Sequence, residues 1–217
     1  MIRTTNFRLL GNFILILIFI IPLSLTAQED YFSGILTMEI KWESDSQVGQ
    51  KLIKKMPASG KYFYKNGSYK QTYDNGDIEF TIHRNGSEYT YTKFRNIDTL
   101  YAENINWIRK IDSSPEISES ENEENLLDLK CKRIELKNDY QTKTFIFSPS
   151  IKIDSKKFKD YINDNRNIFA ELSESIPLKY IVQNELYKMT VTVLKIHENE
   201  LSTDEFKIPN LPITTVK

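Results

Sequence analysis

Hydrophobic and polar residues alternate with a period of two through much of residues 34–100, which is typical of half-buried β-strands. Asn-Gly pairs interrupt the alternation at three places: Asn66-Gly67, Asn75-Gly76 and Asn85-Gly86. An Asn-Gly pair can adopt the two positive φ angles that a tight hairpin turn requires. The pattern therefore predicts a β-meander in which successive strands pair with each other.

Further elements are expected on both sides of the meander. Runs rich in β-branched and aromatic residues predict strands at 35–42, 129–136, 142–147, 178–183, 187–196 and 201–208. Residues 155–173 instead repeat apolar side chains at the spacing of an amphipathic helix, with Asp154 or Ser155 as its N-cap. Together these elements predict one α+β domain dominated by an antiparallel sheet.

The N-terminal segment has a different character. Residues 1–27 contain two arginines, then the apolar run 13–21, and they end at the small residue Ala27. This order is typical of a cleavable signal peptide, and the apolar run is too short to span a membrane; an uncleaved anchor is the alternative. We therefore expect an exported protein with a single mature domain, 28–217, and no transmembrane segment. Its expected location is the periplasm, the outer membrane surface or the cell exterior.

Composition excludes several classes of partner. The chain carries 29 basic and 30 acidic side chains, and this balance provides no basic surface for nucleic acid. The single cysteine, Cys131, excludes an internal disulfide and a thiolate metal cluster, and we expect a buried thiol in a monomer. Acidic residues gather at 112–128, which predicts a solvated loop. A calcium site is the alternative reading, although the spaced ligands and turn glycine of a calcium loop are missing.

No sequence pattern indicates catalysis. The motifs of serine hydrolases, zinc peptidases, phosphate loops and dinucleotide-binding folds are absent. His83 and His197 are expected to be exposed residues beside turns. Asp98-Thr99-Leu100 matches the short acceptor pattern of O-glycosylated exported proteins, which makes Thr99 a candidate modification site. We therefore expect a protein that is not an enzyme and that binds no cofactor or metal.

Four short segments occur in a characteristic order: Phe32-x-Gly34, Lys130-Cys131-Lys132-Arg133, Ile176-Pro177-Leu178-Lys179 and Phe206-Lys207-Ile208-Pro209. This arrangement resembles secreted Bacteroidota families whose fold is like that of the LolA/LolB lipoprotein carriers. Asp128-Leu129-Lys130 stands where such families often have a Gly-Tyr pair before the cysteine. The resemblance implies a curved antiparallel half-barrel of about 9–11 strands with a helix over its concave face, and it implies no catalytic residue.

A covered half-barrel would hold an apolar ligand between the helix and the sheet. The candidate groove residues are Phe80, Ile82, Tyr89, Tyr91, Phe158, Ile162, Phe169, Met189 and Val191. We expect this groove to bind a lipid, a lipoprotein or another apolar molecule. The alternative is a structural module of the cell envelope that contacts another protein and has no small-molecule ligand.

Overall fold

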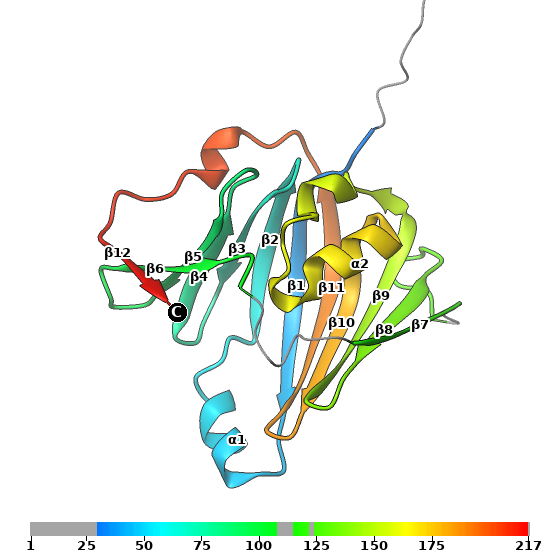
Figure 1. The fold of residues 1–217 in the computed structure, drawn as a ribbon, viewed down its shortest axis with the longest axis horizontal. Helices are drawn as coiled ribbons and strands as arrows, with labels where there is room; N and C mark the ends of the chain where they lie inside the picture. The colour runs from blue at the N-terminus through cyan, green and yellow to red at the C-terminus, as the bar shows by residue number, and fades with distance from the viewer. Residues whose placement is uncertain (1–29, 108–114, 122–123, 217) are drawn as a thin grey trace, which may run out of the picture. The chain divides into compact units, whose positions relative to one another are not determined.

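Twelve strands in the described part of the chain form one open, mixed β-sheet (Figure 1). The computed structural model describes residues 30–107, 115–121 and 124–216, so the expected signal peptide at 1–27 lies outside the described residues. The strand order is β12-β6-β5-β4-β3-β2-β1-β11-β10-β9-β8-β7. The sheet is not closed, because its edge strands β12 and β7 do not pair with each other.

The strands are β1 (Ser33–Glu43), β2 (Ser59–Lys65), β3 (Ser68–Tyr73), β4 (Ile78–His83), β5 (Tyr89–Phe94), β6 (Leu100–Asn104), β7 (Glu116–Glu121), β8 (Lys132–Lys137), β9 (Gln141–Lys152), β10 (Ser175–Asn184), β11 (Lys188–Glu198) and β12 (Ile213–Val216). The described helical segments are α1 (Gln47–Ile53), η2 (Ser155–Phe158), η3 (Asn163–Asn165), α2 (Arg166–Ser173) and η4 (Thr203–Phe206).

The fold is mainly β, so the expected α+β class is wrong. The helices α1 and α2 contain only 7 and 8 residues, which is too short for a helical layer over the sheet. The sheet has 12 strands, and it is mixed because β12 runs parallel to β6. An antiparallel half-barrel of about 9–11 strands under a covering helix is therefore not what forms. Among the described helices, none is both long enough and apolar enough to cross a membrane.

The predicted meander is confirmed. Strands β2, β3, β4 and β5 each pair antiparallel with the next strand in the sequence. At Asn66-Gly67 both φ angles are positive, at 46° and 78°, as a type I′ turn requires. At the other two Asn-Gly pairs only Gly76 and Gly86 have positive φ, and longer loops join those strands. Only the first of the three pairs therefore makes a two-residue hairpin turn.

The single helix expected over 155–173 is wrong, because the chain there forms η2, η3 and α2 in succession. The break falls at Asp164 and Asn165, whose φ angles are 67° and 57°. Asp and Asn tolerate the left-handed region better than most residues, so the local sequence permits a break that the apolar spacing does not indicate. The expected N-cap is confirmed, since the Asp154 side chain accepts a hydrogen bond from the Lys156 amide at 3.2 Å.

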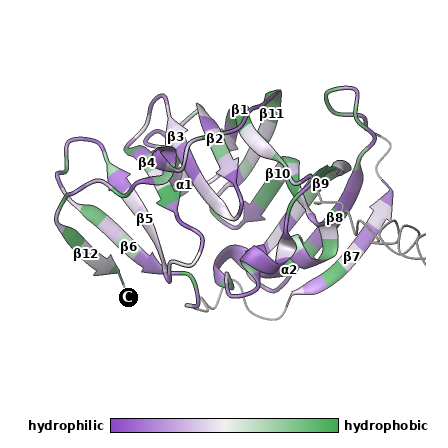
Figure 2. Cartoon of the chain, turned by 90° about the horizontal axis from the view of Figure 1, so that it is seen from above, coloured by the Kyte–Doolittle hydropathy of each residue, from purple (hydrophilic) through white to green (hydrophobic). Residues whose placement is uncertain are grey.

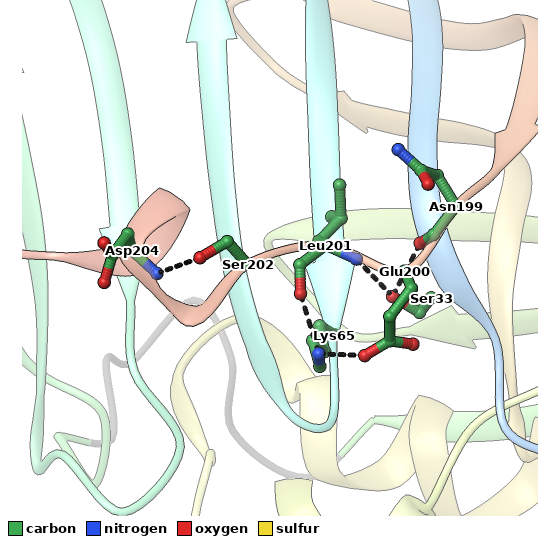
Figure 3. A network of polar contacts seen from close by, with 7 residues as sticks. All are labelled: Ser33, Lys65, Asn199, Glu200, Leu201, Ser202 and Asp204. Atoms are coloured by element: carbon green, nitrogen blue, oxygen red, sulfur yellow. Dashed lines mark hydrogen bonds and ion pairs between the residues drawn. The ribbon is translucent and has the colours of Figure 1, made fainter.

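After β11 the chain crosses the ends of β1 and β2, and side chains of these strands hold it (Figure 3). Ser33 Oγ donates a hydrogen bond to the Asn199 carbonyl at 2.9 Å. Lys65 Nζ donates to the Leu201 carbonyl at 2.7 Å and also pairs with the Glu200 carboxylate. These contacts direct the chain away from β11, in the middle of the sheet, toward the edge at β6.

The strand expected at 201–208 is wrong, because residues 203–206 form the turn η4. The Ser202 side chain caps this turn by accepting from the Asp204 amide at 3.2 Å (Figure 3). Phe206 is buried even though the segment that carries it is not a strand. The proline-containing tail beyond it then adds β12 to the sheet edge, in parallel with β6.

Part of the acidic segment is a strand. Residues 116–121, which lie in the loop expected at 112–128, form β7 and pair antiparallel with β8. All six residues of β7 are exposed, so its glutamates remain in water. A fully exposed strand buries no apolar face, and the alternation that identifies strands in a sequence is therefore weak there.

One face of the sheet is covered by the segment that follows β9. The alternation expected at 35–42 is confirmed, since Leu36, Met38 and Ile40 are buried on one side of β1. The strand pairings place aromatic and aliphatic side chains of the neighbouring strands on this same face. Figure 2 shows the covering residues, including α2, on one side of β9 and β10. The main apolar core lies between this segment and the sheet.

The turn at Gly67 provides a test of this packing. A Cβ atom at Gly67 would lie 2.6 Å from Lys157 Cβ, whereas a Cβ at Gly86, which has a similar φ, would meet nothing within 4 Å. We expect Gly86→Ala to cost about 1–2 kcal/mol of unfolding free energy from the left-handed backbone alone. Gly67→Ala should cost about 1–3 kcal/mol more, because η2 must move. Urea unfolding of both variants measures the difference; equal losses would contradict the packing of η2 on this turn.

Candidate binding cavity

A cavity of about 340 Å³ lies between the covered face of the sheet and the segment that follows β9. This volume falls within the range of small-molecule sites in proteins. Its apolar walls consist of Leu36, Met38, Phe145, Ile153, Phe158, Phe169, Ala170, Ile176, Pro177, Leu178, Val182, Met189, Val191 and Val193. The remaining lining residues are Tyr62, Gln71, Gln141, Lys143, Asp164, Arg166, Ser175, Tyr180 and Tyr187.

The apolar walls follow from strand alternation. Met38 pairs with Val193 across β1 and β11, and Tyr180 pairs with Val191 across β10 and β11. Directly paired residues share a face of the sheet, so these side chains project toward the same space. The sequence thus places an apolar surface along the middle strands of the sheet, and the covering segment leaves part of that surface unfilled.

Phe169 holds α2 against the sheet next to the cavity. Its ring stacks on Phe145 with a centroid distance of 4.5 Å and meets Phe147 edge-on at 5.8 Å. Phe169 is buried and also lines the cavity, so its ring has packed neighbours on one side and open space on the other. The ring therefore acts both as core and as cavity wall.

Charged groups occur where β9 meets the start of α2. The Lys143 side chain is 4% exposed, and its Nζ donates to Asp164 Oδ1 at 3.1 Å and to Asn165 Oδ1 at 3.3 Å. A buried ammonium requires such partners, because desolvation without them is costly. The left-handed residues that break the expected helix are thus the residues that receive the Lys143 cation.

Arg166 places a second cation at the cavity. Its guanidinium carbon lies 4.5 Å from the Tyr69 ring centroid and 5.0 Å from that of Tyr161, within the range of cation–π contacts. Arg166 is only half-buried and lines the cavity, so part of its surface remains accessible. The carboxylate of Asp164, which pairs directly with Lys143, also acts on Arg166 electrostatically.

The two rings under Arg166 belong to a buried polar cluster. The hydroxyls of Tyr69 and Tyr161 lie 2.5 Å apart, and the Thr90 hydroxyl lies 2.8 Å from that of Tyr161. The His83 ring stacks on Tyr69 at 5.5 Å and meets Tyr161 edge-on at 5.2 Å. This cluster connects β3, β4 and β5 to the covering segment, and it fixes the rings that the guanidinium contacts.

Burial controls the protonation of the cluster. Burial raises the pKa of Tyr161 and of Tyr62 above that of a free tyrosine, so both hydroxyls stay neutral near pH 7. Burial also lowers the pKa of His83 to about 4, an effect that the charge of Arg166 reinforces and the Tyr89 carbonyl opposes. The His83 imidazole is therefore neutral at physiological pH, and Tyr62 and Tyr161 supply no phenolate to balance Arg166.

The structure brings together only part of the expected groove. Of its nine residues, four line the cavity: Phe158, Phe169, Met189 and Val191. The meander residues Phe80, Ile82, Tyr89 and Tyr91 do not line it, nor does Ile162, which is half-buried. Those five residues therefore lie outside this cavity.

The register of the meander explains why Ile82 and Tyr91 lie outside the cavity. His83 pairs with Tyr69 and with Thr90, which places all three on the covered face. Ile82 and Tyr91, which pair with each other, must point to the opposite face, because neighbouring residues in a strand alternate. In β4, Phe80 and Ile82 alternate with Thr81 and His83, and the covering segment packs on the side of His83. Strand alternation therefore does not reveal which face is covered.

Other expected features have mixed outcomes. Cys131 is buried, as expected, and burial raises the pKa of its thiol. His197 is exposed, as expected, but His83 is 2% exposed, so its predicted exposure is wrong. Thr99 is half-buried in the connection between β5 and β6, and its modification stays a prediction.

The cations and tyrosines of the cavity were not expected from the sequence. Arg166 and Lys143 occur in segments where charged residues are common, and neither belongs to a recognisable motif. The one available signal is the Asn163-Asp164-Asn165 run, which favours a break in a helix and so indicates that Arg166 begins a new helical segment.

Comparisons with known proteins identify no family. No family model matches the chain, and no curated protein matches it. A solved structure of PNGF-II is similar over 85% of this chain and 31% of that chain, with 8% sequence identity and a TM-score of 0.47. This chain thus spans less than a third of the PNGF-II chain, and a likeness of this degree carries no inference. The resemblance to LolA/LolB-like carriers stays a prediction.

The buried imidazole predicts a pH dependence of stability. Because the pKa of His83 falls from 6.5 in the unfolded chain to about 4 in the folded one, the unfolded state binds more protons between these values. Unfolding free energy should therefore decrease as pH falls from about 6.5 to 4, by up to about 3 kcal/mol from this group.

Two histidine variants isolate this contribution. Urea unfolding between pH 7 and pH 4 should show a smaller loss of stability in His83→Gln than in the parent. The matched control, His197→Gln, changes an exposed histidine and should keep the parental slope. An unchanged slope in His83→Gln would contradict a neutral, buried imidazole.

The dual position of Phe169 predicts an intermediate loss of stability. We expect Phe169→Ala to cost about 3 kcal/mol, the low end for a buried phenylalanine, because one side of the ring already faces open space. Leu172→Ala on the same helix, at a residue 37% exposed, should cost less than about 1 kcal/mol. Chemical denaturation measures both; similar costs at the two positions would contradict the role of Phe169 as the anchor of α2.

Proposed function

We propose that this protein is an exported, non-enzymatic binding protein that holds an apolar small molecule or lipid in the cavity between the sheet and the segment after β9. The observation that carries this proposal is an unfilled space of about 340 Å³ with a mainly aliphatic and aromatic wall. Native cores are close-packed and contain few voids larger than a water molecule. A cavity of this size costs stability, which a ligand would restore by burying its own apolar surface against the same side chains.

The cavity also has the mixed chemistry of a ligand site. Small-molecule sites are usually apolar with a few polar groups that orient the ligand. Here the aliphatic wall of β1, β10 and β11 lies beside Arg166, Lys143 and Gln141. Two cations at the border of a purely structural core would lower stability, because each must be partly removed from water.

An interaction module is the second candidate, and strand β7 favours it. Every residue of β7 is exposed, and the strand lies at the edge of the sheet. Edge strands present backbone groups that can pair with another chain, while charged side chains usually oppose such pairing. The glutamates of β7 would therefore select a basic partner strand. This function needs no ligand in the cavity.

Tryptophan substitutions in β10 separate the two candidates. Val182 is half-buried and lines the cavity, whereas its neighbour Ile181 points to the opposite face. Val182→Trp should fill cavity space and reduce binding of a fluorescent apolar probe at least about tenfold, because a lost contact of 1.4 kcal/mol changes affinity by that factor. Ile181→Trp is the matched control and should leave probe binding unchanged.

Native mass spectrometry of the protein purified from its source cells completes the test. Retained lipid or another apolar molecule on the parent protein, and its loss from Val182→Trp, are the expected results. If the parent neither retains a ligand nor binds the probe, the binding function is wrong and the interaction module remains.

A further inference from the structure

We propose that the ligand of this cavity carries a single carboxylate, which Arg166 binds, while its apolar chain lies along β1, β10 and β11. This inference rests on the proposed binding function and specifies the chemical class of the ligand. It commits to an amphipathic organic acid, of which a fatty acid is the simplest example.

The charged side chains that line the cavity favour a ligand with one negative charge. Lys143 and Arg166 both border the cavity, and Asp164 is the acidic residue that lines it. Asp164 forms an ion pair with Lys143 at 3.1 Å and also interacts electrostatically with Arg166. Tyr62 and Tyr161 remain neutral, because burial raises the pKa of each hydroxyl. The described site therefore has one more positive charge than negative charge, and a monoanion would balance it.

The Arg166 guanidinium is held in a position that suits a carboxylate. The faces of Tyr69 and Tyr161 hold its central carbon at 4.5 Å and 5.0 Å, and these rings are themselves fixed by the 2.5 Å contact between their hydroxyls. An arginine held in this way loses little conformational freedom when it binds a ligand. Its planar fork of N–H donors matches the two oxygens of a carboxylate, which a lysine ammonium does not.

The wall next to the Arg166 cation is apolar. Leu36, Met38, Val191 and Val193 line the same space as Arg166 without offering it a hydrogen-bonding side chain. A small inorganic anion would leave this apolar surface unfilled, and a hydrocarbon would leave the cation unpaired. A molecule with one acidic end and one apolar body satisfies both.

Three probes of the same chain length test the proposal in the parent protein. Dodecanoate, dodecanol and dodecyltrimethylammonium would compete against a fluorescent apolar probe at pH 8. We expect dodecanoate to bind at least about tenfold more tightly than dodecanol, as a charge-assisted hydrogen-bonded pair should provide. The cationic probe should bind most weakly.

The outcomes distinguish this inference from the function on which it rests. Equal affinities for the acid and the alcohol would overturn carboxylate recognition and leave apolar binding intact. Failure of all three probes to bind would overturn both proposals. Tighter binding of the cationic probe would also overturn the acid preference.

Arg166→Gln assigns the preference to this side chain. We expect this variant to bind the acid and the alcohol within about twofold of each other, because the charge-assisted contact is lost while the apolar wall remains. Arg84→Gln, which removes an exposed arginine in a turn of the meander, is the charge-matched control and should keep the parental preference. A preference for the acid that persists in folded Arg166→Gln would overturn the assignment.

Asp164→Asn provides a second variant in case Arg166→Gln does not fold. Asparagine tolerates the left-handed backbone found at Asp164, and its side-chain oxygen can still accept a hydrogen bond from Lys143, so this substitution should keep the turn. Removing the nearby negative charge should strengthen dodecanoate binding several-fold and leave dodecanol binding unchanged. Unchanged dodecanoate affinity in this variant would contradict recognition of an anion at Arg166.

Discussion

The contact of one guanidinium with two tyrosine rings joins the sheet to the segment that covers it. Arg166 begins α2, and Tyr69 lies on β3. Tyr161 belongs to the covering segment, in the connection between η2 and η3. A cation in such a place is costly unless its surroundings stabilise it, and here aromatic faces replace part of the lost water. The left-handed turn at Asp164 and Asn165 follows from this constraint, because a continuous helix would carry Arg166 on a different path.

The cavity is a consequence of the way the cover is held. At one end, Tyr69 and Tyr161 fix the start of α2 through Arg166 and their paired hydroxyls. At the other, Phe169 stacks on Phe145 of β9. Between these two anchors the aliphatic face of β1, β10 and β11 is only partly filled. The proposed binding of an amphipathic acid uses both parts of this arrangement, the cation at the anchor and the open wall beside it.

Local chemistry made some of this structure predictable from the sequence. The meander and the buried face of β1 could be predicted because alternation and Asn-Gly turns act over a few residues. The α+β class could not, because apolar spacing over 155–173 signals burial of one side without excluding a break at Asp164 and Asn165. The strand β12 was missed for a related reason: its pairing with β6 joins segments far apart in the chain, and the four exposed residues of β12 carry no alternation.

The candidate site was predictable only in its apolar part. Residues Phe158, Phe169, Met189 and Val191 were found because buried apolar positions repeat with the period of their element. The meander residues lie outside the cavity, because the covering segment packs on the polar side of β4, the side of His83, and alternation alone does not show this. Arg166 was missed because its role depends on Tyr69, which is distant in sequence, and on the left-handed turn between Tyr161 and Arg166, and no local pattern encodes such contacts.

The central claim is that Arg166 and the aliphatic wall form one site for one ligand. The most direct measurement is a crystal structure of the parent protein with bound dodecanoate. We expect the carboxylate within hydrogen-bonding distance of the Arg166 guanidinium and the hydrocarbon chain against Val191 and Val193. A chain bound elsewhere, or a chain in the cavity with its carboxylate turned away from Arg166, would contradict it.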